Sequence, residues 1–166
     1  MAKTGRTTPL FQKLQIEDVT GVLRDIPVLT FGDVGINYDE FDVSALQDLI
    51  KSFMMGLGTF ALTISGPFDT TTPVAASTSG QASGAHLSGS HAVLEPLNGG
   101  GTPRALGIYF GIQEDWTAGG TEPVFGADNC VIVTGYTVND GKYTCKLAHA
   151  GGGTIPAWGT TAIAVV

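Results

Sequence analysis

The residues of this chain best suited to metal binding or proton transfer are its three histidines, because imidazole titrates near neutral pH and is a common metal ligand. They are His86, His91 and His149. The first two lie five positions apart in a segment of serine, glycine and alanine, which is typical of a loop whose histidines face solvent. Zinc sites instead combine several histidines, cysteines or carboxylates at short spacing. We therefore predict no metal site and no bound cofactor.

The two cysteines, Cys130 and Cys145, are too few for a disulfide framework or a cysteine-rich zinc site. They flank Asn139, Asp140 and Gly141, and an Asp-Gly pair between two β-rich segments is typical of a hairpin turn. In such a hairpin the two cysteines lie several residues out of register, which is farther than a disulfide reaches at strand spacing. The sequence therefore predicts two buried thiols.

The densest group of acidic residues is Asp39, Glu40 and Asp42. On a strand Glu40 and Asp42 share a face, and a pair of carboxylates is able to serve as general acid and base. The alternative is structural: the acids end a strand and place negative charge before a helix that starts at Ser44, which is worth about 0.3–1 kcal/mol. We favour the structural interpretation because no other catalytic group accompanies the acids.

Two further patterns match catalytic or phosphate-binding motifs only in part. Ser88 and Ser90 lie in a glycine-rich segment without the strand–turn–helix setting of a hydrolase nucleophile. Residues 97–104, LNGGGTPR, contain the glycines of a phosphate loop but not the Lys-Ser or Lys-Thr pair of that motif. The sequence therefore predicts a protein that is not an enzyme.

Composition favours a chain that associates with copies of itself. Charged residues make up 14% of the 166 residues, against a usual share of about 25%, and there are 24 glycines. A weakly charged surface promotes association. The net charge of −7 argues against a surface that grips nucleic acid, because such binding depends on lysine and arginine. We expect DNA to pass this protein without specific binding.

We expect synthesis in the cytosol and no membrane insertion. No stretch of the sequence reaches the roughly 18 apolar residues that span a bilayer. Residues 1–14 carry Lys3, Arg6 and Lys13 but lack the apolar core of a secretory signal.

One segment has helical periodicity. Ser44 is a good N-cap, Gln47 completes a capping-box pattern, and Gly56 offers a stop. This pattern predicts one short helix that begins at Ser44 and ends at Met55. Four apolar residues at helical spacing are predicted to dock this helix on a sheet: Leu46, Leu49, Ile50 and Phe53.

The remaining regular segments indicate strands. Residues 14–30 predict two short strands that are separated near residues 23–25, and residues 35–43 predict a third. Residues 58–66 alternate, with Phe60, Leu62 and Ile64 on one face and small polar side chains on the other. Further strands are predicted in residues 104–112, 129–138 and 142–150, with a closing strand in 160–166 and a possible brief one in 91–97.

These elements predict one mainly β domain over residues 1–166, a β-sandwich or barrel with one flanking helix. Residues 1–13 are polar and are predicted to form a flexible arm. Residues 70–101 are rich in glycine, serine and threonine, and are predicted to form a long loop that contacts neighbouring subunits.

Several motifs occur in a fixed order along residues 26–71: an acidic strand end at EFDVS (residues 40–44), a short segment that ends at Gly56, and a strand that closes with GPFD (residues 66–69). Residues 131–152, VIVTGYTVNDGKYTCKLAHAGG, add a final hairpin. In these motifs, which cover about half of the chain, the sequence resembles the tail tube (major tail) proteins of long-tailed bacteriophages.

This resemblance implies a homo-oligomer of six-fold rings that stack into a tube, through which the genome passes into the host. It also implies a virion tail location, assembly in the host bacterial cytoplasm, and other tail proteins as partners at the tube ends. The residues predicted to contact neighbouring subunits are Leu10, Phe11, Phe68, Thr71, Pro73, His86 and Leu87. Alternatives are another virion component, such as a head decoration or tail-end protein, and a small β-sandwich binding module.

Overall fold

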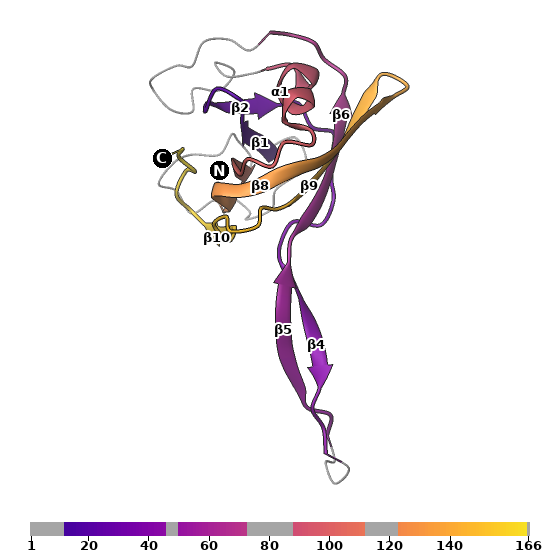
Figure 1. The fold of residues 1–166 in the computed structure, drawn as a ribbon, viewed down its shortest axis with the longest axis vertical. Helices are drawn as coiled ribbons and strands as arrows, with labels where there is room; N and C mark the ends of the chain where they lie inside the picture. Colours follow the sequence, from indigo (N-terminus) through magenta and orange to yellow (C-terminus); the bar gives the residue numbers. More distant parts are fainter. Residues whose placement is uncertain (1–11, 46–49, 73–87, 112–122, 166) are drawn as a thin grey trace, which may run out of the picture.

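The computed structural model describes residues 12–45, 50–72, 88–111 and 123–165, and these residues are mostly β. Figure 1 shows a compact β body and one long hairpin that extends away from it. The strands are β1 (Gln12–Glu17), β2 (Leu23–Ile26), β3 (Thr30–Phe31), β4 (Asn37–Asp42), β5 (Phe53–Thr59), β6 (Ala61–Pro67), β7 (Arg104–Phe110), β8 (Val124–Asn139), β9 (Lys142–His149) and β10 (Ala157–Gly159), and the helix is α1 (Ser90–Leu97).

The main sheet is antiparallel and curls back on itself. Its strand order is β2-β1-β7-β8-β9-β6-β3, and β10 pairs with β8. The two ends of this order, β2 and β3, are consecutive in sequence, so the Cα atoms of Ile26 and Thr30 are at most roughly 14 Å apart. The hydroxyl of Tyr143 on β9 donates a hydrogen bond of 2.8 Å to the carbonyl oxygen of Pro27 in this link. The sheet is therefore rolled into a barrel.

Alternation along the strands decides which side chains fill the barrel. Leu62 and Ile64 on β6 are buried, whereas Ala61 and Thr63 between them are exposed, as the sequence predicts. The core contains buried residues from every long strand of the barrel. They include Leu14, Ile16, Leu62, Ile64, Leu106, Ile108, Phe125, Val131, Val133, Tyr143 and Leu147.

The hairpin of β8 and β9 is confirmed. Asn139 pairs with Lys142, and the two turn residues Asp140 and Gly141 have φ values of 50° and 69°. These left-handed conformations match a two-residue turn that follows the twist of the strands. The hairpin holds the predicted thiols out of register: Cys145 pairs with Tyr136, and both cysteines are buried and free.

Helix α1 covers one end of the barrel (Figure 1). Val93, Leu94 and Leu97 belong to the same core as the strands. Ser90 fixes the start of the helix, because its hydroxyl donates to the carbonyl oxygen of Pro67 at 2.9 Å and accepts from the N–H of Asp69 at 3.2 Å. No helix in the described parts of the chain is long and apolar enough to cross a membrane.

The predicted helix from Ser44 to Met55 is wrong. Phe53 begins strand β5, and its side chain is 56% exposed, while that of Ile50 is 81% exposed, so neither docks on a sheet. Leu46 and Leu49 lie outside the described residues. A three-turn helix is marginal without packing, and pairing with β4 satisfies the same backbone groups. The one helix of the described residues is α1, in a segment that the sequence predicts as a loop with a brief strand.

Two strand boundaries also differ from the prediction. Residues 23–25, predicted as a break, belong to β2, and the turn lies at residues 18–22. The Asp18 carboxylate organises this turn by accepting from the N–H groups of Thr20 and Val22 at 2.8 and 3.1 Å. Residues 160–165 form no strand, and the last strand is β10. The predicted arm and long loop lie largely outside the described residues.

Candidate interaction surface

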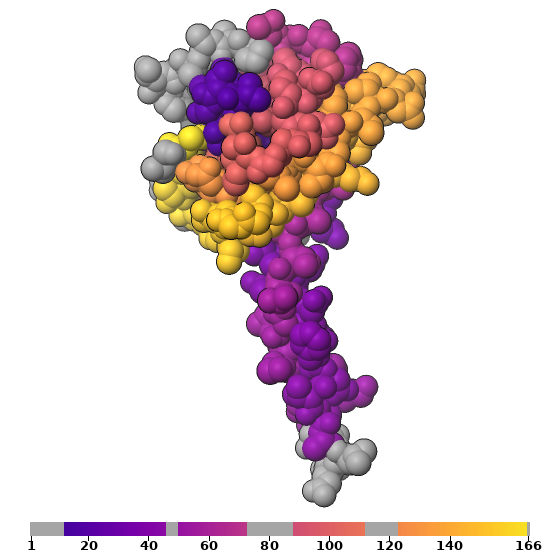
Figure 2. All heavy atoms as spheres, in the orientation of Figure 1, coloured from indigo at the N-terminus to yellow at the C-terminus, as the bar shows by residue number. Residues whose placement is uncertain are grey.

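The hairpin of β4 and β5 forms a separate two-stranded sheet that projects from the barrel (Figures 1 and 2). Its pairs include Phe41 with Met54 and Asp42 with Phe53. Large apolar side chains on and beside the hairpin are 52–81% exposed: Tyr38, Phe41, Val43, Ile50, Phe53, Met54, Met55 and Leu57. A folded domain rarely exposes so many large apolar side chains together unless they form an interface.

Two aromatic rings stiffen the hairpin, and both lie on the face of β5 that Gly56 and Gly58 share. The ring of Phe41 lies across the backbone of Gly56, and the ring of Tyr38 lies across Gly58, at positions that a Cβ atom would occupy. An aromatic ring over a cross-strand glycine restores packing that the glycine lacks. The strands therefore hold their pairing although they leave the barrel, but a two-stranded hairpin alone is only marginally stable in water.

Polar contacts organise the end of the hairpin farther from the barrel. The N–H of Ser52 donates to the hydroxyl of Ser44 at 2.7 Å, and the N–H of Ser44 donates to Asp42 at 2.9 Å. Hydrogen bonds from Ser44 lower the pKa of the Asp42 carboxyl. Asp42 thus orders a turn. With no helix at Ser44, the predicted favourable charge ahead of that helix is wrong.

The hairpin has an uneven charge distribution. Asp39, Glu40 and Asp42 are exposed on β4, and Lys51 is the one cationic residue in the described part of residues 37–59. The acids are interleaved with Phe41 and face Phe53 and Met55 in the register. The hairpin therefore presents apolar side chains with an acidic strand and a single amine.

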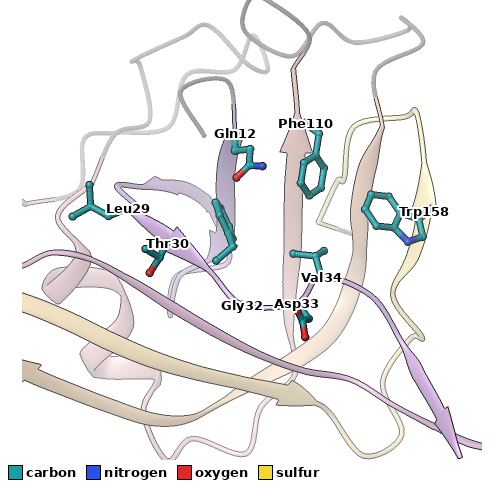
Figure 3. Close-up of a pocket in the computed structure, with 9 residues that line it drawn as sticks. Gln12, Leu29, Thr30, Gly32, Asp33, Val34, Phe110 and Trp158 are labelled. Atoms are coloured by element: carbon teal, nitrogen blue, oxygen red, sulfur yellow. The ribbon is translucent and has the colours of Figure 1, made fainter. Parts of the chain in front are cut away.

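A concavity of about 500 Å³ lies in the wall of the barrel near the point where the hairpin starts (Figure 3). Side chains from separate segments surround it: Leu29, Phe31, Val34, Phe110 and Trp158, with Gln12, Thr30, Gly32 and Asp33 completing its lining. The Trp158 ring lies 5.5 Å from that of Phe110 and 5.1 Å from that of Phe125, measured between centroids. Leu29 and Trp158 are 58% and 55% exposed, so the concavity opens to solvent.

The outer face of β6 and β9 differs from both of these surfaces. Thr63 pairs with Lys146 and Ser65 pairs with Thr144, and their side chains alternate with buried ones. Lys142 and Lys146 are exposed on β9. Among the outward positions of β6 and β9 there is no carboxylate, so this face is small, hydroxyl-rich and positive.

Two of the residues predicted to contact neighbouring subunits are placed by the structure. The Phe68 ring packs 5.0 Å from the imidazole of His91, and Thr71 is exposed and donates to the Asp69 carboxylate at 2.6 Å. Both lie on the α1 side of the barrel, away from the β4–β5 hairpin. The others lie outside the described residues: Leu10, Phe11, Pro73, His86 and Leu87.

Burial keeps the two thiols protonated. It raises the pKa of Cys130 to about 11 and that of Cys145 to about 12. His91 lies 3.4 Å from the hydroxyl of Tyr136, and His149 lies 3.1 Å from the carbonyl oxygen of Cys130. In the described ranges, no three histidines, cysteines or carboxylates gather in a group able to hold a metal ion.

The fold of the chain as a whole is similar to solved structures from contractile injection systems. No protein-family model and no curated protein matches the sequence. The anti-feeding prophage cap, a tube-terminating cap, superposes with a TM-score of 0.52 and 12% identity over 97% of this chain and 95% of that chain. The PVC sheath/tube terminator of an extracellular contractile injection system, in its extended state, gives 0.51 and 13% over 94% and 99%.

Proposed function

We propose that this chain is a structural subunit of a phage-tail-like tube. The observation that carries the proposal is the β4–β5 hairpin, whose large apolar side chains are 52–81% exposed on two strands that no described element covers. The likeness in fold to structures named for tube terminators supports a role in such an assembly. We also propose that the chain has no catalytic activity.

The molecule consists of a rolled barrel and the projecting β4–β5 hairpin, and this division suits a repeating assembly. Neighbouring strands of the barrel pair along the order from β2 to β3, and their buried side chains form a core within one copy. The β4–β5 hairpin, by contrast, gains most of its stability by burying its apolar side chains against another copy. A contact between unlike surfaces of identical copies builds rings or open stacks. The tail tube resemblance supports six copies in each ring.

The hydroxyl-rich face of β6 and β9 is the surface best suited to the wall of a channel. Its side chains are small, and it lacks the large apolar groups that a protein interface buries. Lys142 and Lys146 give it positive charge, in contrast to the acidic wall that the net charge of −7 suggests. Two isolated amines per copy attract phosphates weakly and without base specificity.

The second candidate is a subunit that closes the end of a tube. It is favoured by the two structural neighbours, which are named for tube termination and not for the repeating wall. Both candidates use the exposed hairpin for contacts between copies or with other tail proteins. They differ in whether the assembly of this chain alone continues or stops.

Electron microscopy of the purified protein at high concentration tests the proposal and separates the candidates. Long hollow tubes support the repeating wall, whereas single or paired rings support the tube end. Protein that stays monomeric at every concentration contradicts the repeating wall, and its failure to bind preformed tail tubes contradicts the tube end as well. A Phe41→Asp variant, which places charge on the hairpin, is expected to lose assembly, while Thr20→Ser on a distant turn serves as the control.

A further inference from the structure

We propose that the end of the β4–β5 hairpin of one copy binds in the concavity of Figure 3 on a second copy. This inference rests on the proposed function, because it names the surface that receives the hairpin in the assembly. It pairs the exposed apolar arm of the described chain with an open apolar hollow on the barrel.

The concavity has the size and lining of a site for large apolar side chains. Its volume of about 500 Å³ exceeds that of any single side chain, and it is lined by Leu29, Phe31, Val34, Phe110 and Trp158. Aromatic side chains in a hollow of this kind carry a large share of the binding energy at protein interfaces. The Trp158 ring contacts the rings of Phe110 and Phe125, which orient it before a partner binds.

The hairpin is the matching convex surface. Phe53, Met54 and Met55 begin β5 at the end away from the barrel, and they are 56%, 58% and 67% exposed. Methionine side chains adapt their shape to an irregular hollow. The hairpin cannot fill the concavity of its own copy, because the seven residues of β5 carry its end about 23 Å away from the barrel. The occupant is therefore the hairpin of another copy.

Charge favours the same pairing. Lys51 is the one cation in the described part of the hairpin, and it lies two residues before Phe53. Asp33 is an exposed carboxylate in the lining of the concavity. Phe53 and Met55 share one face of β5, and insertion of this face brings the Lys51 amine to the rim where Asp33 lies. Two smaller hollows at the base of the hairpin, of about 330 and 240 Å³, have no carboxylate in their linings, so they offer Lys51 no partner of opposite charge.

A charge exchange tests the pairing. Asp33→Lys and Lys51→Glu are each expected to weaken self-association at least tenfold in sedimentation velocity, since each change places like charges at the rim. The double variant Asp33→Lys/Lys51→Glu is expected to recover most of the lost association. Lys142→Glu, on a different face, is the matched control and is expected to leave association unchanged. Both changed positions are exposed, so the barrel folds in every variant, which thermal unfolding verifies.

The outcomes separate this inference from the proposed function. Assembly that is insensitive to both single changes, or a double variant no better than either single one, overturns the pairing while the tube proposal stands. Wild-type protein that never associates overturns both. Trp158→Ala provides a second test that is independent of charge, because it removes the aromatic wall of the concavity. It is expected to weaken association at least tenfold without changing the pairing of β8 with β9 seen by hydrogen exchange, and unchanged association overturns the pairing.

Discussion

The ring of Phe41 lies across the backbone of Gly56 on the neighbouring strand, in the place where a side chain at position 56 would lie. This relationship helps to fix the conformation of a hairpin whose two strands form a sheet of their own, which no other strand of the described residues joins. It also leaves more than half of the Phe41 side chain exposed, which keeps the ring available to another copy. One glycine therefore contributes both to the shape of the arm and to its surface.

Substitution of Gly56 is expected to damage the arm and spare the barrel. In Gly56→Val the new side chain displaces the Phe41 ring, so amide exchange in residues 37–42 and 53–59 accelerates and self-association falls. The thermal midpoint of the barrel stays within a few degrees of wild type, because the core contains none of these residues. Gly135→Ala, at a glycine with ordinary space around its backbone, is the control. If Gly56→Val lowers the thermal midpoint of the barrel as well as the protection of the hairpin amides from exchange, the hairpin and the barrel are not independent, which contradicts this prediction.

Deprotonation of the Tyr109 phenol is expected to lower the free energy of unfolding at alkaline pH. Burial raises the pKa of its phenol to about 12, from an ordinary value of 10.0. The folded state holds the proton more tightly than the unfolded state, so the stabilisation is complete below about pH 10 and is lost as the pH rises toward 12. The loss is of the order of 2 kcal/mol. Urea unfolding across this range tests it: Tyr109→Phe is expected to make the fall in stability smaller, while the part that comes from the buried thiols Cys130 and Cys145 remains. A variant as pH-sensitive as wild type contradicts the assignment.

Ser90 is expected to anchor α1 on the barrel. Its fully buried hydroxyl bridges the carbonyl oxygen of Pro67 and the N–H of Asp69. Ser90→Ala leaves both partners without this bond and is expected to cost about 1–3 kcal/mol of unfolding free energy. Ser52→Ala, in the exposed hairpin, is expected to change unfolding by less than about 0.5 kcal/mol. Equal effects of the two changes in urea unfolding contradict the anchoring role.

If the outer face of β6 and β9 lines the channel of the tube, only small reagents are expected to reach this face in the assembled protein. In assembled protein, Thr63→Cys on β6 is expected to react with a small maleimide but not with one attached to a bulky protein, whereas Thr20→Cys reacts with both. The native thiols do not interfere, because Cys130 and Cys145 are buried and burial raises the pKa of each. Rapid reaction of Thr63→Cys with the bulky reagent places this face on the outside and contradicts the assignment.

The sequence predicts the structure correctly where a residue pattern is compatible with only one kind of local structure. The alternation around Leu62 and Ile64 fits only a half-buried strand, and Asp140-Gly141 fits only a tight turn. The mainly β fold with one short helix follows from such segments.

It failed where two periods fit the same residues. Ile50 and Phe53 fit a helix face, but Phe53 and the residues after it pair with β4 as a strand, and local propensity does not decide between the two structures. The helix α1 was missed because its two turns carry no capping side chain and include Pro96. The concavity was missed because Leu29, Phe110 and Trp158 are far apart in sequence and meet only in the rolled sheet.

Hydrogen exchange of residues 37–42 and 53–59, in free and assembled protein, tests the central claim most directly. If the hairpin is an arm that another copy covers, its amides exchange rapidly in the free subunit and at least tenfold more slowly in the assembly, while the amides of β6 and β9 stay slow in both. Equal exchange of the hairpin in both states would contradict the claim that this surface joins the subunits.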